Sequence, residues 1–204
     1  MRQPSGPRID ANDTRFSSSP FIVGNLLYAA NIVGVTDNLV THDAVQWLIF
    51  NMDTDTLLAT GLVSDPGFDY TYVSVAANAA GDFMLAFNRS GGANTPADNI
   101  SAYADHCQFD SATRSVSCES PTLLSQGLTG DYTQNGGGRF RWGDYSAIAI
   151  DPSNSSVFWA AVEVPISSGI WGTQITEIVV TPEPAAFVFT GIGMALLIAC
   201  RRRR

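Results

Sequence analysis

Histidine is the side chain that most often supplies a general base near neutral pH, and this chain contains two, His42 and His106. Neither lies near a Gly-x-Ser-x-Gly segment, which would place a nucleophilic serine on a sharp turn. His106 and Cys107 are both metal-ligand types, but no second pair stands at zinc-ligand spacing. The sequence therefore predicts no catalytic residues and no metal site, and it favours a protein that is not an enzyme.

Two cysteines, Cys107 and Cys118, stand eleven residues apart at the adjacent ends of two expected strands. In a hairpin these positions face each other, so we expect a disulfide in an oxidising compartment. Closing a loop of about 12 residues would stabilise the fold by roughly 3 kcal/mol in the chain-entropy model. The alternative is a pair of free buried thiols. The third cysteine, Cys200, lies in the C-terminal apolar run and is not expected to reach either of them.

Carboxylates and arginines define the alternative function, a carbohydrate-active hydrolase. A glycosidase needs two carboxylates across a cleft, and the acidic residues next to expected loops are Asp69, Asp131, Asp144 and Glu163. A sialidase would add arginines for a carboxylated sugar, and the arginines near these loops are Arg89, Arg139 and Arg141. Pairing with local aspartates is the more ordinary role of such arginines.

The densest local group of binding side chains is Trp142, Asp144 and Tyr145. Two aromatic rings beside a glycine and a carboxylate are suited to a sugar- or cation-binding surface, so a surface polysaccharide is one expected partner. The alternative is a turn whose aromatics pack between sheets and whose aspartate accepts backbone hydrogen bonds.

Oxygen ligands for a hard cation gather near the glycine-rich segment 127–138, and these residues are Asp131, Asn135, Asp144 and Asp151. No EF-hand or nonapeptide spacing accompanies them. We therefore predict no cofactor, with calcium as the alternative.

Charge excludes one large class of partners. Residues 1–180 carry 18 acidic side chains against seven arginines, and the whole chain contains no lysine. Binding to the phosphates of DNA or RNA requires the opposite balance, so we expect no nucleic-acid partner.

The elements that would position these residues are short strands. Alternation and turn residues predict strands in three groups. The expected ranges are 16–23, 26–35, 44–52 and 56–63, then 70–78, 83–88, 100–108 and 116–124, then 145–150, 157–164 and 173–180. The fold class is therefore all-β, with antiparallel sheets.

The groups resemble repeats of one unit. Residues 74–84 align without a gap on residues 147–157, at an offset of 73. Four-stranded repeats of this length are typical of the blades of a β-propeller, although a β-sandwich or a β-solenoid would also give many short strands. Three blades do not close a ring, so we expect an incomplete propeller over residues 1–180.

The C-terminus, residues 181–204, differs from the rest. An uncharged run at 185–200 precedes Arg201, Arg202, Arg203 and Arg204. About 16 apolar residues form a helix of about 24 Å, which would cross a bilayer only marginally. The arginines would stay on the cytoplasmic side, so the body would lie on the opposite side. The alternative is a C-terminal core helix.

Pro182, Glu183 and Pro184, followed by this helix and the arginine cluster, resemble the PEP-CTERM sorting signal of Gram-negative bacteria. The resemblance covers about 24 residues. It implies recognition by an exosortase, cleavage near Pro-Glu-Pro, and delivery to the cell surface or the extracellular matrix. The chain would be tethered to the inner membrane through its helix before cleavage.

The body has a second resemblance. Residues 139–152, with Phe158-Trp159 and residues 171–175, are similar to the final blades of sialidase-like propellers in exported bacterial proteins, and residues 74–78 and 87–91 resemble the preceding blade. The Ser-x-Asp-x-Gly-x-x-Trp turn of true sialidase blades is absent.

The N-terminus, residues 1–8, lacks the apolar segment of a secretory signal peptide. We therefore expect the chain to be the C-terminal part of a longer precursor, or its start to be assigned too late. The favoured function is a non-enzymatic binding or structural module on the cell surface.

Overall fold

The computed structural model describes residues 1–10, 15–16, 18–37, 39–133, 140–143 and 146–181. Apart from the single 3-10 turn η1 (Pro96–Asp98), the regular structure in these ranges is β-strand, and almost all pairing is antiparallel. The all-β, antiparallel fold class predicted from the sequence is therefore confirmed.

The first sheet contains four strands in chain order: β2 (Phe21–Val23), β3 (Leu26–Asp37), β4 (Val40–Asn51) and β5 (Thr56–Val63). The sequence predicted this group, but its first strand is shorter than the expected range of 16–23. Pro20 immediately precedes β2 and has no backbone N–H to donate to the ladder, so pairing starts only at Phe21.

The central sheet has the strand order β10 (Thr122–Ser125), β8 (Ser101–Asp110), β7 (Asp82–Gly91) and β6 (Phe68–Ala77), and β9 (Ser115–Cys118) also pairs with β8. The prediction of one continuous strand over 116–124 was wrong. Residues 119–121 interrupt it, and Pro121 cannot supply a ladder hydrogen bond. β8 therefore pairs with two short strands in succession along one edge.

The third sheet contains β12 (Ala147–Asp151), β13 (Asn154–Ser167) and β14 (Ile170–Val179), the three strands expected for the last group. A small parallel pair, β1 (Ile9–Asp10) with β11 (Phe140–Arg141), was not predicted. Two residues per strand are too few to show an alternating pattern, so sequence periodicity could not identify this pair.

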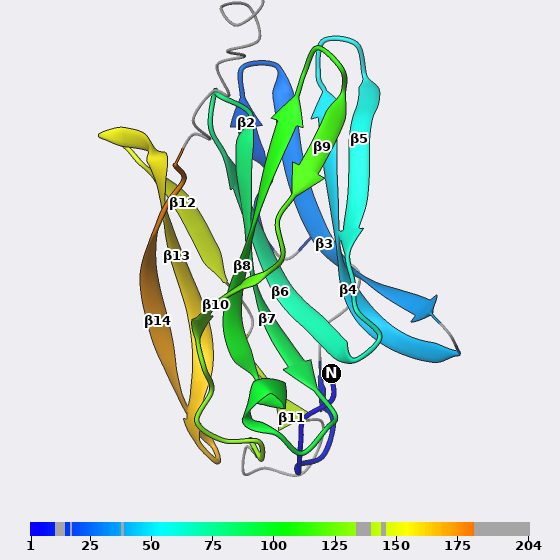
Figure 1. The fold of residues 1–204 in the computed structure, drawn as a ribbon, viewed down its shortest axis with the longest axis vertical. Coiled ribbons are helices and arrows are strands. Elements are labelled where there is room, and N and C mark those ends of the chain that lie inside the picture. Colours follow the sequence, from blue (N-terminus) through cyan, green and yellow to red (C-terminus); the bar gives the residue numbers. More distant parts are fainter. Residues whose placement is uncertain (11–14, 17, 38, 134–139, 144–145, 182–204) are drawn as a thin grey trace, which may run out of the picture.

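The three large sheets are stacked, with the central sheet between the other two (Figure 1). On one face of the central sheet, Phe83 packs against Tyr28 and Trp47 of the first sheet, at ring-centroid distances of 5.6 Å and 5.4 Å. On the other face, Met84 lies in a core cluster with Phe158 of the third sheet. Covering on both sides explains why β6 and β7 are buried along almost their whole length.

The outward faces of the two flanking sheets carry exposed apolar side chains. On the first sheet these are Ile22, Leu57 and Leu62. On the third sheet they are Trp159, Trp171, Ile175 and Val179, with Ile175 66% exposed. The described strands form three large open sheets and one two-stranded pair, and they do not close into a barrel or a propeller ring.

No helix within the described ranges is long and apolar enough to cross a membrane. The predicted helix at 185–200 and the sorting motif, which consists of Pro182, Glu183, Pro184 and Arg201 to Arg204, lie outside the described residues.

Candidate functional site

Trp142 lies in a small core cluster that also contains Met1, Ile9, Tyr72, Ile100 and Tyr132. It is 2% exposed, its Nε1 donates a hydrogen bond to Oδ1 of Asn88 at 3.0 Å, and its ring meets Tyr132 edge-on at 4.7 Å. The ring is therefore enclosed by protein and offers no surface to a sugar. Asp144 and Tyr145, its expected partners in ligand binding, lie outside the described residues.

The carboxylates considered for glycoside hydrolysis have separate surroundings. Asp69 is buried and is held by Arg2, whose Nε lies 3.0 Å from Oδ2. Burial acts to raise the pKa of Asp69, but the hydrogen bonds from the side chain and backbone of Arg2 outweigh it, and the net pKa is lowered. Asp131 is exposed, and Glu163 lies on β13 in the third sheet. These three carboxylates therefore belong to different parts of the fold.

Arg89, expected as one member of a sugar-binding arginine cluster, is instead half-buried against two aromatic rings. Its guanidinium carbon lies 4.0 Å from the ring centroids of both Phe68 and Tyr103, and Nη2 donates to the Tyr103 hydroxyl at 2.6 Å. Cation–π contacts and a hydrogen bond give this arginine a structural role. Arg141 is exposed, and Arg139 lies outside the described residues.

Of the calcium ligands considered, Asp151 caps the turn between β12 and β13. Its carboxylate accepts hydrogen bonds from the backbone N–H and hydroxyl of Ser153 and from Nε1 of Trp159. The hydrogen bonds from Ser153 and Trp159 lower the pKa of Asp151 to about 2. Asn135 and Asp144 lie outside the described residues, so the complete ligand set is not described.

The predicted disulfide between Cys107 and Cys118 is present. The two residues are directly opposite in the β8–β9 register, with Cα atoms 4.0 Å apart. Cys107 is fully buried in the core between the central and first sheets, whereas Cys118 is exposed on the short edge strand β9. One residue of the bonded pair is therefore buried and the other is exposed.

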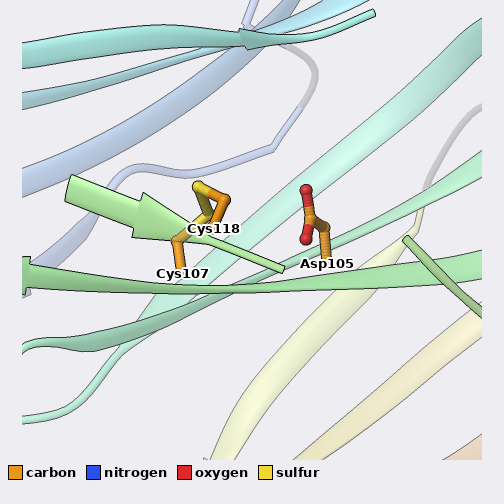
Figure 2. A group of neighbouring side chains, drawn as sticks. All are labelled: Asp105, Cys107 and Cys118. Carbon is orange, nitrogen blue, oxygen red and sulfur yellow. A yellow bond between two sulfur atoms is a disulfide. The ribbon is translucent and has the colours of Figure 1, made fainter. Parts of the chain in front are cut away.

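Asp105 lies next to this disulfide, as Figure 2 shows. It precedes Cys107 by two positions on β8, so both side chains leave the same face of the strand. A carboxylate oxygen of Asp105 and the two sulfur atoms all lie within 4.8 Å of one another. The disulfide-bonded sulfurs lack the thiolate charge that metal ligation needs, so this group is not a metal site while the disulfide is intact.

The carboxyl group of Asp105 is 2% exposed, and its Oδ1 has no hydrogen-bond partner in the part of the chain that the structure describes. Burial, and then the charge of Glu119, raise the pKa of Asp105 to about 7, and His106 opposes this shift. Asp105 was not among the functional residues predicted from the sequence. A usable signal was present, because Tyr103, Asp105, Cys107 and Phe109 alternate along β8 and three of them are typical core residues.

The opposite face of β8 carries His106. Its Nδ1 lies 3.1 Å from Oε1 of Glu119, and its Nε2 lies 3.2 Å from Oδ1 of Asp82. Both ring nitrogens of His106 are therefore engaged by carboxylates, one from each side of the ring.

Two adjoining cavities of about 270 Å³ each open beside His106, between the edge of the central sheet and β14. Shared lining residues are His106, Glu119, Val180 and Thr181. Their walls are mixed polar and apolar, and Asp82 lines one of them. No arginine of the described ranges lines either cavity.

No family model, curated protein or solved structure matches this chain.

Proposed function

We propose that this protein is exported, is processed by an exosortase at its C-terminal tail, and acts at the cell surface or in the extracellular matrix as a non-enzymatic binding or structural module. The observation that carries the proposal is the disulfide between Cys107 and Cys118. Disulfides persist in oxidising compartments and are rare in the cytosol, so this bond supports an exported body. The sequence of the tail is the basis for the proposed recognition by an exosortase and the delivery to the cell surface.

The absence of enzymatic activity in this proposal rests on the side chains already described. Arg89 packs against Phe68 and Tyr103, Asp69 is held by Arg2, and His106 contacts two carboxylates. A hydrolase would instead need two carboxylates facing one cleft. Hydrolysis of chromogenic glycosides, lost on substitution of one carboxylate, would contradict this part of the proposal.

The three stacked sheets are, in this proposal, neighbouring blades of a β-propeller. Their meandering antiparallel order and face-to-face packing support this, as do the apolar outward faces of the first and third sheets. A blade exposes apolar side chains on both faces until a neighbour covers each one. The expected ligand of such a module is a surface polysaccharide, which binding to a glycan array would detect.

The proposed processing predicts that Glu183→Ala abolishes cleavage. The chain is fused behind a secretory signal peptide and produced in a Gram-negative host with and without its exosortase. We expect the unmodified tail to be removed only when the exosortase is present, and intact-mass spectrometry would detect the loss. Glu183→Ala should keep the tail and remain in the membrane fraction.

Glu177→Ala is the matched control, because Glu177 is an exposed glutamate on β14, six residues before Glu183. This variant should be processed like the unmodified chain. Tail removal that does not depend on the exosortase, or normal processing of Glu183→Ala, would contradict the proposal.

A further inference from the structure

The disulfide of the central sheet is asymmetric in its access to solvent. Cys118 is exposed on the edge strand β9, while Cys107 is 0% exposed within the core between the first and central sheets. Cys118 is therefore the residue of the pair that a thiol from solution can approach. Attack there expels the Cys107 sulfur as a thiolate inside an apolar core, where an isolated negative charge is costly.

Asp105 is positioned to remove that cost. Its carboxyl oxygen lies within 4.8 Å of both sulfurs, and the intervening residue on β8 points to the opposite face. The Oδ1 atom has no hydrogen-bond partner in the described ranges, although the residue is 98% buried. A buried polar group without a partner calls for an explanation, because an apolar residue of similar size would fit such a core at lower cost.

We propose that Cys107 and Cys118 form a site of thiol–disulfide exchange with small external thiols, and that Asp105 is its proton donor. The attacking thiolate forms a bond with the Cys118 sulfur, and the bond between the two cysteine sulfurs breaks. The electron pair passes to the Cys107 sulfur, which takes the proton of Asp105 and becomes a neutral thiol. Asp105 is left as a carboxylate.

A second thiolate completes the reduction. It attacks the external sulfur of the mixed disulfide, releases the Cys118 thiolate and leaves as a symmetrical disulfide of the small thiol. The Cys118 thiolate takes a proton from water. Reoxidation by the small disulfide follows the same steps in reverse, and Asp105 then accepts the proton of Cys107.

The proton is available under neutral conditions, because the pKa of Asp105 is raised to about 7. The elements packed on this side of β8 carry several charged or titratable groups. They are Tyr28 on β3, His42 and Asp43 on β4, Tyr70 on β6 and Arg89 on β7, with Tyr103 and His106 on β8 itself and Glu119 after β9, while β5 carries none. Among them, Glu119 raises the pKa of Asp105 and His106 lowers it.

The test measures how fast 2-mercaptoethanol opens the disulfide of the full-length folded chain between pH 5.5 and pH 9. Peptide-level mass spectrometry after alkylation follows Cys107 and Cys118 separately from Cys200. Each rate is divided by the concentration of 2-mercaptoethanol that is present as thiolate. The ionisation of the reagent itself then makes no contribution to the pH dependence. We expect this rate constant to fall about tenfold as pH rises through 7, because Asp105 then loses its proton. The decrease is smaller than the usual contribution of general-acid catalysis, because a thiolate can also leave without being protonated.

Asp105→Asn should react about tenfold more slowly than the unmodified chain at pH 6, with a constant that no longer changes through pH 7. Asp82→Asn is the matched control, since it makes the same chemical change in the same sheet on the face of His106. It should keep the unmodified profile. Trapped intermediates should carry the small thiol on Cys118.

A pH-independent constant in the unmodified chain would overturn the proposal, and this measurement does not depend on the folding of any variant. An adduct on Cys107, or equal rates for Asp105→Asn and the unmodified chain, would overturn it as well.

Discussion

Asp105 brings a carboxyl group into a core of aromatic and aliphatic side chains. Desolvation penalises its ionised form, so the folded chain retains a proton that the unfolded chain releases. An unfolded aspartate titrates near pH 3.9, while the folded pKa of Asp105 is raised to about 7. Between these values the folded state binds more protons than the unfolded state. The contribution of Asp105 to stability is therefore present below this window and is lost as pH rises through it.

Asp105→Asn should remove this pH dependence. The amide has nearly the same shape as the protonated acid and carries no charge at any pH, so the variant should match the unmodified chain near pH 4. At pH 8 we expect the variant to be more stable by about 1–3 kcal/mol, because burial penalises the ionised carboxylate of Asp105 but not the neutral amide. Urea unfolding at both pH values measures the difference.

Asp37→Asn, at the exposed end of β3, controls for the loss of one negative charge from an acidic protein. It should follow the pH profile of the unmodified chain. A destabilisation of Asp105→Asn that is equal at pH 4 and pH 8 would contradict the assigned role of the charge.

At the scale of residues, sequence spacing was sufficient to predict the disulfide, but it was not sufficient to predict the buried Asp105 beside it. Cys107 and Cys118 could be paired because a hairpin places the ends of adjacent strands opposite each other. The burial of Asp105 depends on which face of β8 meets the first sheet, and that is a tertiary fact. Trp142 shows the same limit, because its hydrogen bond to Asn88 joins residues 54 positions apart.

At the scale of elements, β8 contributes side chains to two hydrophobic cores, one on each face of the central sheet. Tyr103 and Cys107 face the first sheet, and Ala104 faces the third. Strand positions were predictable from turn residues and alternation, which fixed the hairpin at residues 24–25 and the strand at 56–63. The prediction of one strand over 116–124 missed the break between β9 and β10, although Glu119 and Ser120 are polar and Pro121 cannot pair. The break leaves β9 held to the sheet by β8 and by the disulfide.

Removal of the disulfide should destabilise the folded chain. Simultaneous Cys107→Ala and Cys118→Ala substitutions reopen a loop of about 12 residues, and we expect a loss of roughly 3 kcal/mol. Chemical unfolding in the absence of reductant measures it. Cys200→Ala is the control variant, because this cysteine lies in the C-terminal apolar run and should leave stability unchanged. If the double variant is as stable as the unmodified chain, the disulfide does not hold β9.

At the scale of the whole molecule, the central sheet is covered on both faces and the flanking sheets on one. Sequence grouping predicted the three sheets and their antiparallel order, because local turns connect the strands of each sheet. It could not predict how many sheets meet, since stacking depends on contacts between distant residues. The exposed Trp159, Trp171 and Ile175 on one outer face, and Leu57 and Leu62 on the other, are what neighbouring blades would cover.

These outer faces should make the chain self-associate when no neighbouring blade is supplied. Exposed apolar patches of this kind mark contact surfaces, so we expect concentration-dependent sedimentation and binding of a hydrophobic dye. Ile175 is 66% exposed and points outward from β14, so Ile175→Lys should weaken association at least about tenfold, or about 1.4 kcal/mol.

Thr173→Lys, two residues away on the same face of the same strand, adds the same charge without removing an apolar side chain. The apolar contact governs association if Thr173→Lys weakens it much less than Ile175→Lys. A monomeric unmodified chain that binds no dye would show that the outer faces need no covering sheet, and it would remove the main structural support for neighbouring blades.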